Sequence, residues 1–282
     1  MKIEFTQHIL MHALIGGVMA SIICGIIGII VLEKRLVMMS GGIAHSAIGG
    51  MGLGYFFNFA PMIGAVVVAV LASLGIGRFQ RRQNETSDVL IGIFWAVSMA
   101  IGVFLMDLAG KQVEFEEYLF GNIFTISTLQ LWLFLGLMLL LILVFIGLFH
   151  AFKAYLFDEE YASVQGLNVR FFEWFLFIVL GFTTILMIKV VGMLLVIALY
   201  SAPPAIAKRL TKVFYRVIIL TIVLNLFFVL VGVVISYVLH ISSGTAIVFL
   251  TGITYFTVMT IDLLRTKQRL RRDRLINEDT QT

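Results

Sequence analysis

The sequence predicts an all-α, polytopic membrane protein, because of its composition, its long apolar segments and the positions of its charges. Hydrophobic residues make up 61% of the 282 residues and charged residues only 13%, and the mean hydropathy is +1.06. A soluble domain of this length would expose far too much apolar surface to water. The single cysteine, Cys24, excludes a disulfide framework and a cysteine-rich metal site.

Apolar segments of spanning length predict about nine transmembrane helices within one domain, residues 1–264. Each segment is close to the length of helix that crosses the hydrocarbon core of a bilayer. The segments cover residues 9–32, 36–58, 61–77, 89–109, 130–150, 171–188, 190–207, 214–238 and 244–264. Eight spans are the alternative if residues 190–207 do not cross.

The basic residues predict the orientation of these spans. With the N-terminus outside, 17 of the 20 lysines and arginines fall on one side of the membrane. Basic residues collect on the cytoplasmic side, so the sequence predicts an N-out, C-in topology. Residues 265–282 then form a basic cytoplasmic tail, which we interpret as an anchor at the anionic leaflet rather than a nucleic-acid site.

The first span carries two histidines one helical turn apart, His8 and His12, near its outer end. Side chains at i and i+4 lie on one face of a helix, so the two imidazoles could share a metal ion. The alternative is an interfacial pair that is simply solvated.

The second span carries a histidine among glycines, in the stretch SGGIAHSAIGG at residues 40–50. An ionisable ring at bilayer depth is costly unless it faces a packed interior or a wet path, so His45 is a candidate functional residue. Gly41, Gly49 and Gly52 lie on the same helical face as His45. Their lack of side-chain bulk leaves room for a solvated ion or for a closely packed partner helix.

A polar stretch at residues 157–167 interrupts the apolar segments on the cytoplasmic side. Asp158 can cap a short helix, Glu159 and Glu160 suit its first turn, and Gly166 can end it. Such a helix suits docking onto another protein, and an ordinary loop helix is the alternative. Further along, Pro203 and Pro204 predict a break near the cytoplasmic end of the span at 190–207, and a simple kink packed by neighbouring helices is the alternative.

Seven short segments occur in one order across most of the chain. They are EKRLVMMS at 33–40, IAH at 43–45, LFGNI at 119–123, FDEEYA at 157–162, GL at 166–167, VVGMLLVIAL at 190–199 and PAIA at 204–207. Together they resemble the membrane permeases of ABC importers for divalent transition metals, the zinc, manganese and iron class called the ABC-3 family.

This resemblance implies a type II ABC-importer-like permease in the cytoplasmic membrane of a bacterium or archaeon. The expected partners are a second copy of the chain, two cytoplasmic ATPase subunits and an extracytoplasmic metal-binding protein, with no nucleic acid. No permanently bound cofactor is implied, since the divalent metal ion is the transported substrate. The residues implied to couple the chain to the ATPase are Asp158, Glu159, Glu160, Tyr161, Val164 and Gly166.

The resemblance also makes His45 a transient metal contact on the translocation path, together with Gly41, Gly49 and Gly52. Many family members carry an acidic residue four positions before this histidine, where the present chain has Gly41. Only the histidine half of the acid–histidine pair is therefore present. Weak contact suits a conduit, because a tightly held ion cannot leave.

Other function classes fit the sequence less well. An ion-coupled secondary transporter would need a carboxylate relay, whereas Asp107, Glu173 and Asp262 all lie near the ends of spans. An intramembrane enzyme would need a catalytic motif, and the sequence contains no HExxH, GxSxG or phosphate-binding P-loop. ATP hydrolysis is therefore expected on a partner chain. An ABC permease for a metal chelate stays open as an alternative, and the metal itself is not readable.

Overall fold

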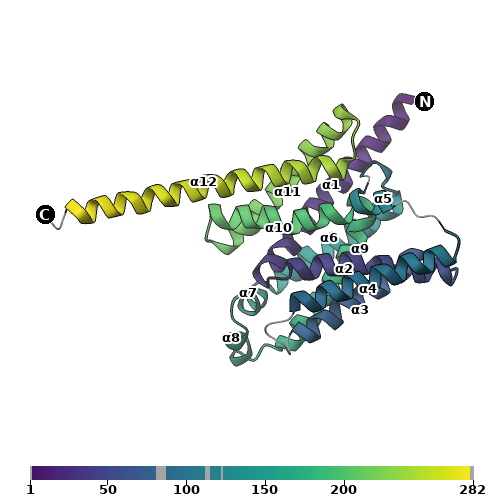
Figure 1. Cartoon of the computed structure of the whole chain (residues 1–282), viewed down its shortest axis with the longest axis horizontal. Helices are drawn as coiled ribbons and strands as arrows, with labels where there is room; N and C mark the ends of the chain where they lie inside the picture. The colour runs from purple at the N-terminus through teal and green to yellow at the C-terminus, as the bar shows by residue number, and fades with distance from the viewer. Residues whose placement is uncertain (1, 81–86, 112–114, 122, 280–282) are drawn as a thin grey trace.

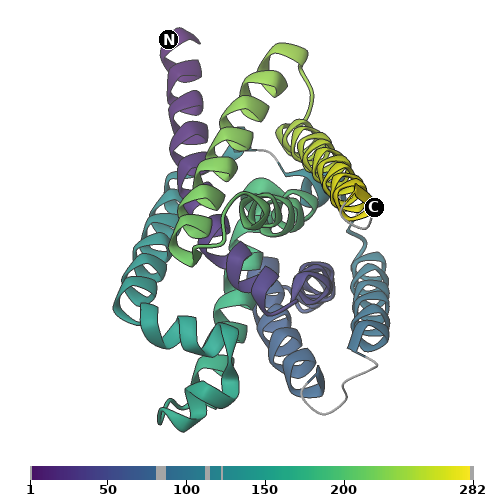
Figure 2. The ribbon, with the colours of Figure 1, turned by 90° about the vertical axis from the view of Figure 1, so that its left-hand side faces the viewer.

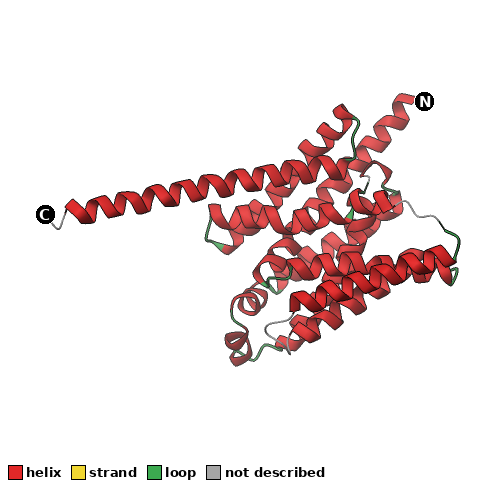
Figure 3. Cartoon of the chain, viewed as in Figure 1, coloured by secondary structure: helices red, strands yellow, loops and turns green. Residues whose placement is uncertain are grey.

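The computed structural model describes residues 2–80, 87–111, 115–121 and 123–279, and within them every regular element is a helix (Figure 3). Nine helices of this described part have 18 or more residues. They are α1 (Lys2–Glu33), α2 (Val37–Phe56), α3 (Pro61–Gln80), α4 (Ser87–Leu108), α6 (Thr128–Gly147), α9 (Val169–Val191), α10 (Met193–Leu210), α11 (Phe214–Leu239) and α12 (Ser243–Asp279). The shorter elements are α5 (Phe115–Phe120), a 3-10 turn (Ile123–Thr125), α7 (Phe149–Phe157) and α8 (Glu159–Val164).

Eight helices of the described residues are long and apolar enough to cross a membrane, namely α1, α3, α4, α6 and α9 to α12. The remaining predicted span, α2, is 20 residues long but is not among these eight, because six glycines and His45 lower its hydropathy. Fifteen of its residues are buried by other helices, so α2 needs no lipid-facing apolar surface. The uncertain span is therefore α2 and not residues 190–207, which the sequence singles out.

Pro203 and Pro204 do not break α10, contrary to the sequence-based expectation. The helix runs without interruption from Met193 to Leu210, and both prolines are buried within it. A membrane helix tolerates proline where neighbouring helices and side chains satisfy the backbone groups that it frees. The hydroxyl of Ser201 donates to the carbonyl of Ile197 at 2.8 Å in the same stretch.

The two ends of the chain lie at opposite ends of the helical bundle (Figure 1). The start of α1 lies at the end that also holds α5, whereas α8 and the far end of α12 lie at the other. This arrangement fits an odd number of crossings. The basic stretch after residue 264 continues α12 as one helix as far as Asp279, so the tail has no backbone break from the last span.

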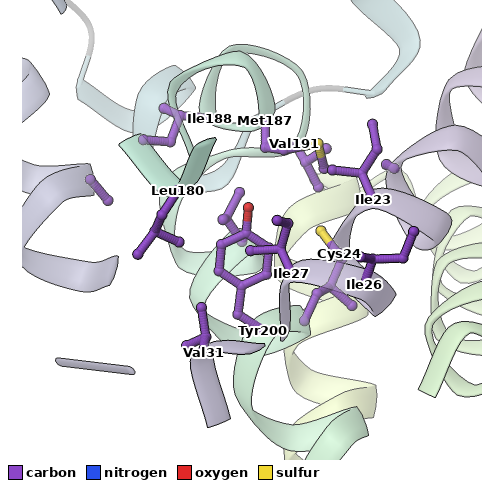
Figure 4. Packing of buried hydrophobic residues seen from close by; sticks show 14 of the residues in the cluster. Ile23, Cys24, Ile26, Ile27, Val31, Leu180, Met187, Ile188, Val191 and Tyr200 are labelled. Atoms are coloured by element: carbon purple, nitrogen blue, oxygen red, sulfur yellow. The ribbon is translucent and has the colours of Figure 1, made fainter. Parts of the chain in front are cut away.

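The core of the bundle forms around α1, which contacts α6, α10 and α11. Tyr200 of α10 is fully buried beside Cys24 and Ile27 of α1 and Leu180 of α9 (Figure 4). A Cβ atom added to Gly28 would lie 3.1 Å from the Cα and carbonyl oxygen of Tyr200. The backbones of α1 and α10 therefore touch at the level of this ring.

Three glycines join the outer ends of α5, α10 and α12. Gly121 and Gly192 both have positive φ angles, +62° and +85°. A Cβ on Gly121 would lie 2.6 Å from the carbonyl oxygen of Val191, and one on Gly192 would lie 2.7 Å from that of Phe120. Gly244, at the start of α12, lies against the same Phe120 carbonyl. Two of the sequence motifs, LFGNI and VVGMLLVIAL, thus meet in space because only glycine fits there.

We expect Gly192→Ala to destabilise the bundle by at least about 1–3 kcal/mol, since φ +85° and ψ 152° form a backbone conformation nearly restricted to glycine. The apparent unfolding temperature of the detergent-purified protein measures this loss. Gly92→Ala in α4 is the matched control, because a Cβ at Gly92 meets nothing within 4 Å. Equal unfolding temperatures for Gly192→Ala and the unmodified chain would contradict the glycine junction.

Candidate functional site: the histidine of α2 and the cytoplasmic helix α8

The helix that carries His45 lies inside the bundle. α2 packs mainly against α3 and α4 and also contacts α9 and α10, and these helices lie around it in Figure 2. Its glycines bring the backbones together: a Cβ on Gly50 would lie 2.8 Å from the Cα of Ala65 in α3. Interfaces of this kind are typical of membrane helices, where small residues allow the close approach on which association depends.

His45 lies between α2 and α4. Its side chain is 8% exposed, and its ring stacks on Trp95 of α4 with the centroids 4.0 Å apart and the planes 14° apart. The Nδ1 atom of His45 is buried and has no hydrogen-bond partner among the described residues. A buried nitrogen without a partner costs free energy, so this atom is available to a ligand that reaches the ring.

The three glycines on the face of His45 have different surroundings. A Cβ on Gly49 would lie 2.6 Å from the carbonyl oxygen of Ser98, and one on Gly52 would lie 2.6 Å from the Cα of Gly102. Both glycines therefore hold α4 close and leave no open volume. A Cβ on Gly41 would meet only Cδ1 of Ile197 in α10, at an ordinary 3.6 Å. The sequence allows either a solvated ion or a closely packed partner helix beside these glycines, and at Gly49 and Gly52 the structure places a partner helix.

Trp95 is the residue of this site that sequence reasoning missed. It lies 50 positions after His45, on a different helix, so no spacing rule links the two rings. The available signal was a tryptophan in the middle of an apolar span, and the structure shows its side chain half-buried. Ser98, one turn further along α4, donates from its hydroxyl to the carbonyl of Ser46 at 3.0 Å and fixes the same contact.

The predicted cytoplasmic helix is present as α8, with the ends that the sequence indicates. The carboxylate of Asp158 accepts the backbone N–H of Tyr161 at 2.9 Å and caps the first turn. Glu159 and Glu160 follow in that turn, where negative charge suits the helix dipole. Gly166 has φ +81° and lies just past the end of the helix, as in a glycine-ended helix.

Part of the exposed surface of α8 is apolar. Val164 is 87% exposed and Tyr161 is 53% exposed, and Phe157 just before the helix is 56% exposed. Tyr161 and Val164 are three residues apart within α8, so they share one side of that helix, and Phe157 lies just before it at the end of α7. On the cytoplasmic side of the membrane, such a cluster next to acidic residues is typical of a protein-docking surface.

The described residues do not assemble a metal cage. Within the described residues there is no group of three or more histidine, cysteine, aspartate or glutamate side chains that could hold a metal ion. His8 and His12 both lie in α1, and His12 is half-buried, but the side chain of His8 lies outside the described set. The shared site that the sequence suggests for them stays a prediction.

Comparison with known proteins identifies the family to which a chain with this buried histidine and this capped cytoplasmic helix belongs. A family model described as the ABC 3 transport family matches residues 6–262. The chain belongs to the ABC 3 transport family. The match covers all nine long helices in whole or in part, and it also covers α8.

Three relatives of this ABC 3 family member match nearly the whole chain. An uncharacterised membrane protein of Synechocystis is 37% identical, over 90% of either chain. A protein of Chlamydia muridarum named a probable metal transport system membrane protein is 30% identical, over 88% of this chain and 87% of its own length. A manganese transport system membrane protein of Listeria innocua is 29% identical, over 88% of both.

Solved structures show the same fold. PsaBC from Streptococcus pneumoniae in complex with Fab matches with a TM-score of 0.79 at 24% identity, over 92% of this chain and 95% of that one. A transporter described as of the metal-chelate ABC type, in an inward-facing conformation, matches with a TM-score of 0.68 at 13% identity. The permease architecture expected from the sequence is confirmed.

The glycine contacts predict opposite outcomes for two similar substitutions. Gly41→Ala should fold normally, since its Cβ meets only a side-chain methyl group at 3.6 Å. Gly49→Ala should lower stability by roughly 1–3 kcal/mol, because α2 and α4 must move apart to admit the methyl group. Monodispersity in size-exclusion chromatography and the apparent unfolding temperature measure both. Equal behaviour of the two variants would contradict the packing described for this face.

Proposed function

We propose that this chain is the membrane-spanning permease of an ABC importer that conducts divalent transition-metal ions into the cytoplasm. The observation that carries the proposal is the ABC 3 transport family match over residues 6–262. Relatives that carry metal transport in their names, at 29–30% identity, support it. The chain contributes a buried imidazole within the bundle and an apolar docking helix at one end of it.

Manganese is the favoured cargo. The relatives from Listeria innocua and Halalkalibacterium halodurans are both named manganese transport system membrane proteins. The chemistry of His45 does not itself choose a metal, because an imidazole suits zinc, iron, nickel and copper alike, and it does not exclude manganese, whose preferred ligands are oxygens. Zinc and iron are therefore the competing cargoes in any transport measurement.

The partners follow from the class of transporter. A second copy of the chain completes the conduit, two cytoplasmic ATPase subunits bind at α8, and an extracytoplasmic metal-binding protein docks at the opposite end. The assembly sits in the cytoplasmic membrane of a bacterium or archaeon. The apolar side chains of Tyr161 and Val164 support the place of the ATPase, since both are exposed on α8, which lies at the end of the bundle away from the start of α1 (Figure 1).

His45 is the side chain proposed to contact the passing metal. Its Nδ1 lacks a partner among the described residues, and Gly41 one turn before it leaves space on the side of α10. A single imidazole without the acidic residue of other family members gives a weak, short-lived contact. Such contacts suit conduction, which requires that the ion leave as readily as it enters.

Replacement of the imidazole tests this role. In His45→Ala, uptake of radioactive manganese per folded permease should fall by about tenfold or more, the loss typical when a group that tunes a metal site is removed. Liposomes that contain the permease with its ATPase provide the measurement. Gly41→Asp places a carboxylate one turn before His45, so this variant should bind the metal more tightly and release it more slowly. Unchanged uptake per folded permease in His45→Ala would leave the ring as a packing contact with Trp95.

Charge on the outer surface of α8 should separate ATP hydrolysis from transport. We expect Tyr161→Asp with Val164→Asp to abolish stimulation of the ATPase by the loaded binding protein, because two docking side chains become charged. Ser163→Asp is the matched control, since it adds charge to the same helix at an exposed polar position. Normal transport by the double variant would show that α8 is an ordinary loop helix.

One reconstitution decides between the classes of function. Liposomes that hold the permease, its ATPase and the binding protein should take up manganese only with ATP inside and with the ATPase present. Uptake that follows a proton or sodium gradient without the ATPase would replace the proposal with a secondary transporter. Uptake of a metal chelate, but not of the aqueous metal, would change the cargo and keep the permease.

A further inference from the structure

The turn between α1 and α2 is closed by its own hydrogen bonds. The N–H of Leu36 donates to the carbonyl of Val31 at 2.7 Å, and the N–H of Arg35 donates to that of Leu32 at 3.2 Å. This is the two-bond C-terminal motif that usually places glycine in the left-handed conformation. Arg35 occupies that position, with φ 57°. A turn this short and well bonded ties the orientation of α2 to the end of α1.

Lys34 projects from this turn onto the corner between α7 and α8. Its ammonium group donates to the carboxylate of Glu159 at 2.6 Å and to the backbone carbonyl of Tyr155 at 2.7 Å. The same nitrogen lies 3.9 Å from the centre of the Tyr155 ring. The side chain of Lys34 is 15% exposed, so these contacts are partly shielded from water. One lysine therefore touches the last turn of α7, an aromatic ring and the first turn of α8.

Within the described residues, α8 packs mainly on the helices next to it in the chain. Of its six residues, only Ala162 is buried, and the helix otherwise packs on its neighbours α7 and α9. The pair of Lys34 with Glu159 therefore provides a direct link from α8 to the turn that starts α2. Tyr155 is buried and stacks on Phe172 of α9, which fixes the other end of the contact.

The same turn also reaches two helices on the other side. Glu33, the residue before Lys34, forms an ion pair with Lys208 of α10, in which Nζ of Lys208 lies 2.9 Å from Oε2 of Glu33. Arg209, the residue after Lys208, pairs with Asp262 of α12. Consecutive side chains thus connect α8, the α1–α2 turn, α10 and α12 in one series. α10 also packs directly against α2, where the side chain of Ile197 lies beside Gly41.

We propose that Lys34 is the positioning residue that carries movement of α8 to α2. The proposal rests on the proposed docking of an ATPase at α8, and it names the physical link from that helix to the histidine of the conduit. Displacement of α8 pulls on Lys34 through Glu159 and the Tyr155 carbonyl. The bonded turn passes that displacement to α2, and His45 lies about 12 Å along α2 from its first residue. Backbone contacts with α3 and α4 make α2 move as a rigid unit.

The first arm of the test needs neither ATPase nor metal. A nitroxide at Val164→Cys reports the mobility of α8 in the full chain, while the native Cys24 is buried and unreactive. Lys34→Met should increase the mobility of the label, and Lys34→Arg should restore it. Lys153→Met is the matched control, because Lys153 is an exposed lysine of α7. Equal mobility in Lys34→Met and the parent would overturn the proposal.

The second arm measures coupling in the complete transporter. In liposomes with ATPase and binding protein, Lys34→Met should lower the manganese transported per ATP by about tenfold while ATP hydrolysis continues. Glu159→Gln removes the ion pair from the exposed partner and should act in the same direction, which keeps the test valid if Lys34→Met does not fold. An unmodified complex without ATP-driven uptake would refute the proposed function. An active unmodified complex with unchanged transport per ATP in both variants would refute the role of Lys34 alone.

Discussion

Close contact between helix backbones through glycine is the constraint on which the rest of this structure depends. In a bilayer, lipid tails are as apolar as leucine, so burial of apolar surface does little to hold one helix against another. Contact must come from dispersion forces, which fall steeply with distance. The glycines of α2 remove the side chains that would separate it from α3 and α4, as at Gly50 and Gly52. The same device joins α5, α10 and α12 at Gly121, Gly192 and Gly244.

This packing explains how a long helix that is not apolar enough to count as a typical span can hold the functional candidate. A helix face that borders lipid must present apolar side chains. α2 is instead enclosed by other helices, so it can carry His45 and two serines. The hydroxyls of Ser40 and Ser46 donate to carbonyls of their own helix, which satisfies them without water. The imidazole is left with a buried nitrogen and a stacked tryptophan. A rigid enclosure with one unsatisfied polar atom is a suitable setting for transient contact with a cation.

Electrostatics acts at the cytoplasmic end of the bundle, where the helices can be moved. The ion pairs of Lys34, Lys208 and Arg209 are partly exposed, so each contributes about 0–1 kcal/mol to stability. Their importance is geometric, since each joins elements far apart in the sequence. Lys34 and Glu159 are 125 residues apart and Lys208 and Glu33 are 175 apart. A weakly attached helix with defined links to stronger ones is a suitable receiver for movement.

The sequence by itself determined the helical class, the positions of the long helices and the capped helix at Asp158. These features depend on local chemistry: runs of apolar residues of spanning length, the split of basic residues, and side chains that satisfy a helix end within four residues. It also determined that His45 is unusual, because an imidazole among glycines in a span is visible without any partner. The order of its motifs was enough to indicate the family.

Tertiary structure alone decided which helix is enclosed, what the glycines contact and which side chains meet. The sequence predicts a break in residues 190–207, because proline normally breaks a helix. Packing against neighbouring helices nevertheless keeps α10 continuous. It could not tell whether Gly49 bordered open space or another backbone, since both need the same small residue. Trp95 and Ser98 reach α2, and Lys34 reaches α8, only through contacts between elements far apart in the sequence. Such contacts depend on the relative placement of whole helices, which no local pattern of residues specifies.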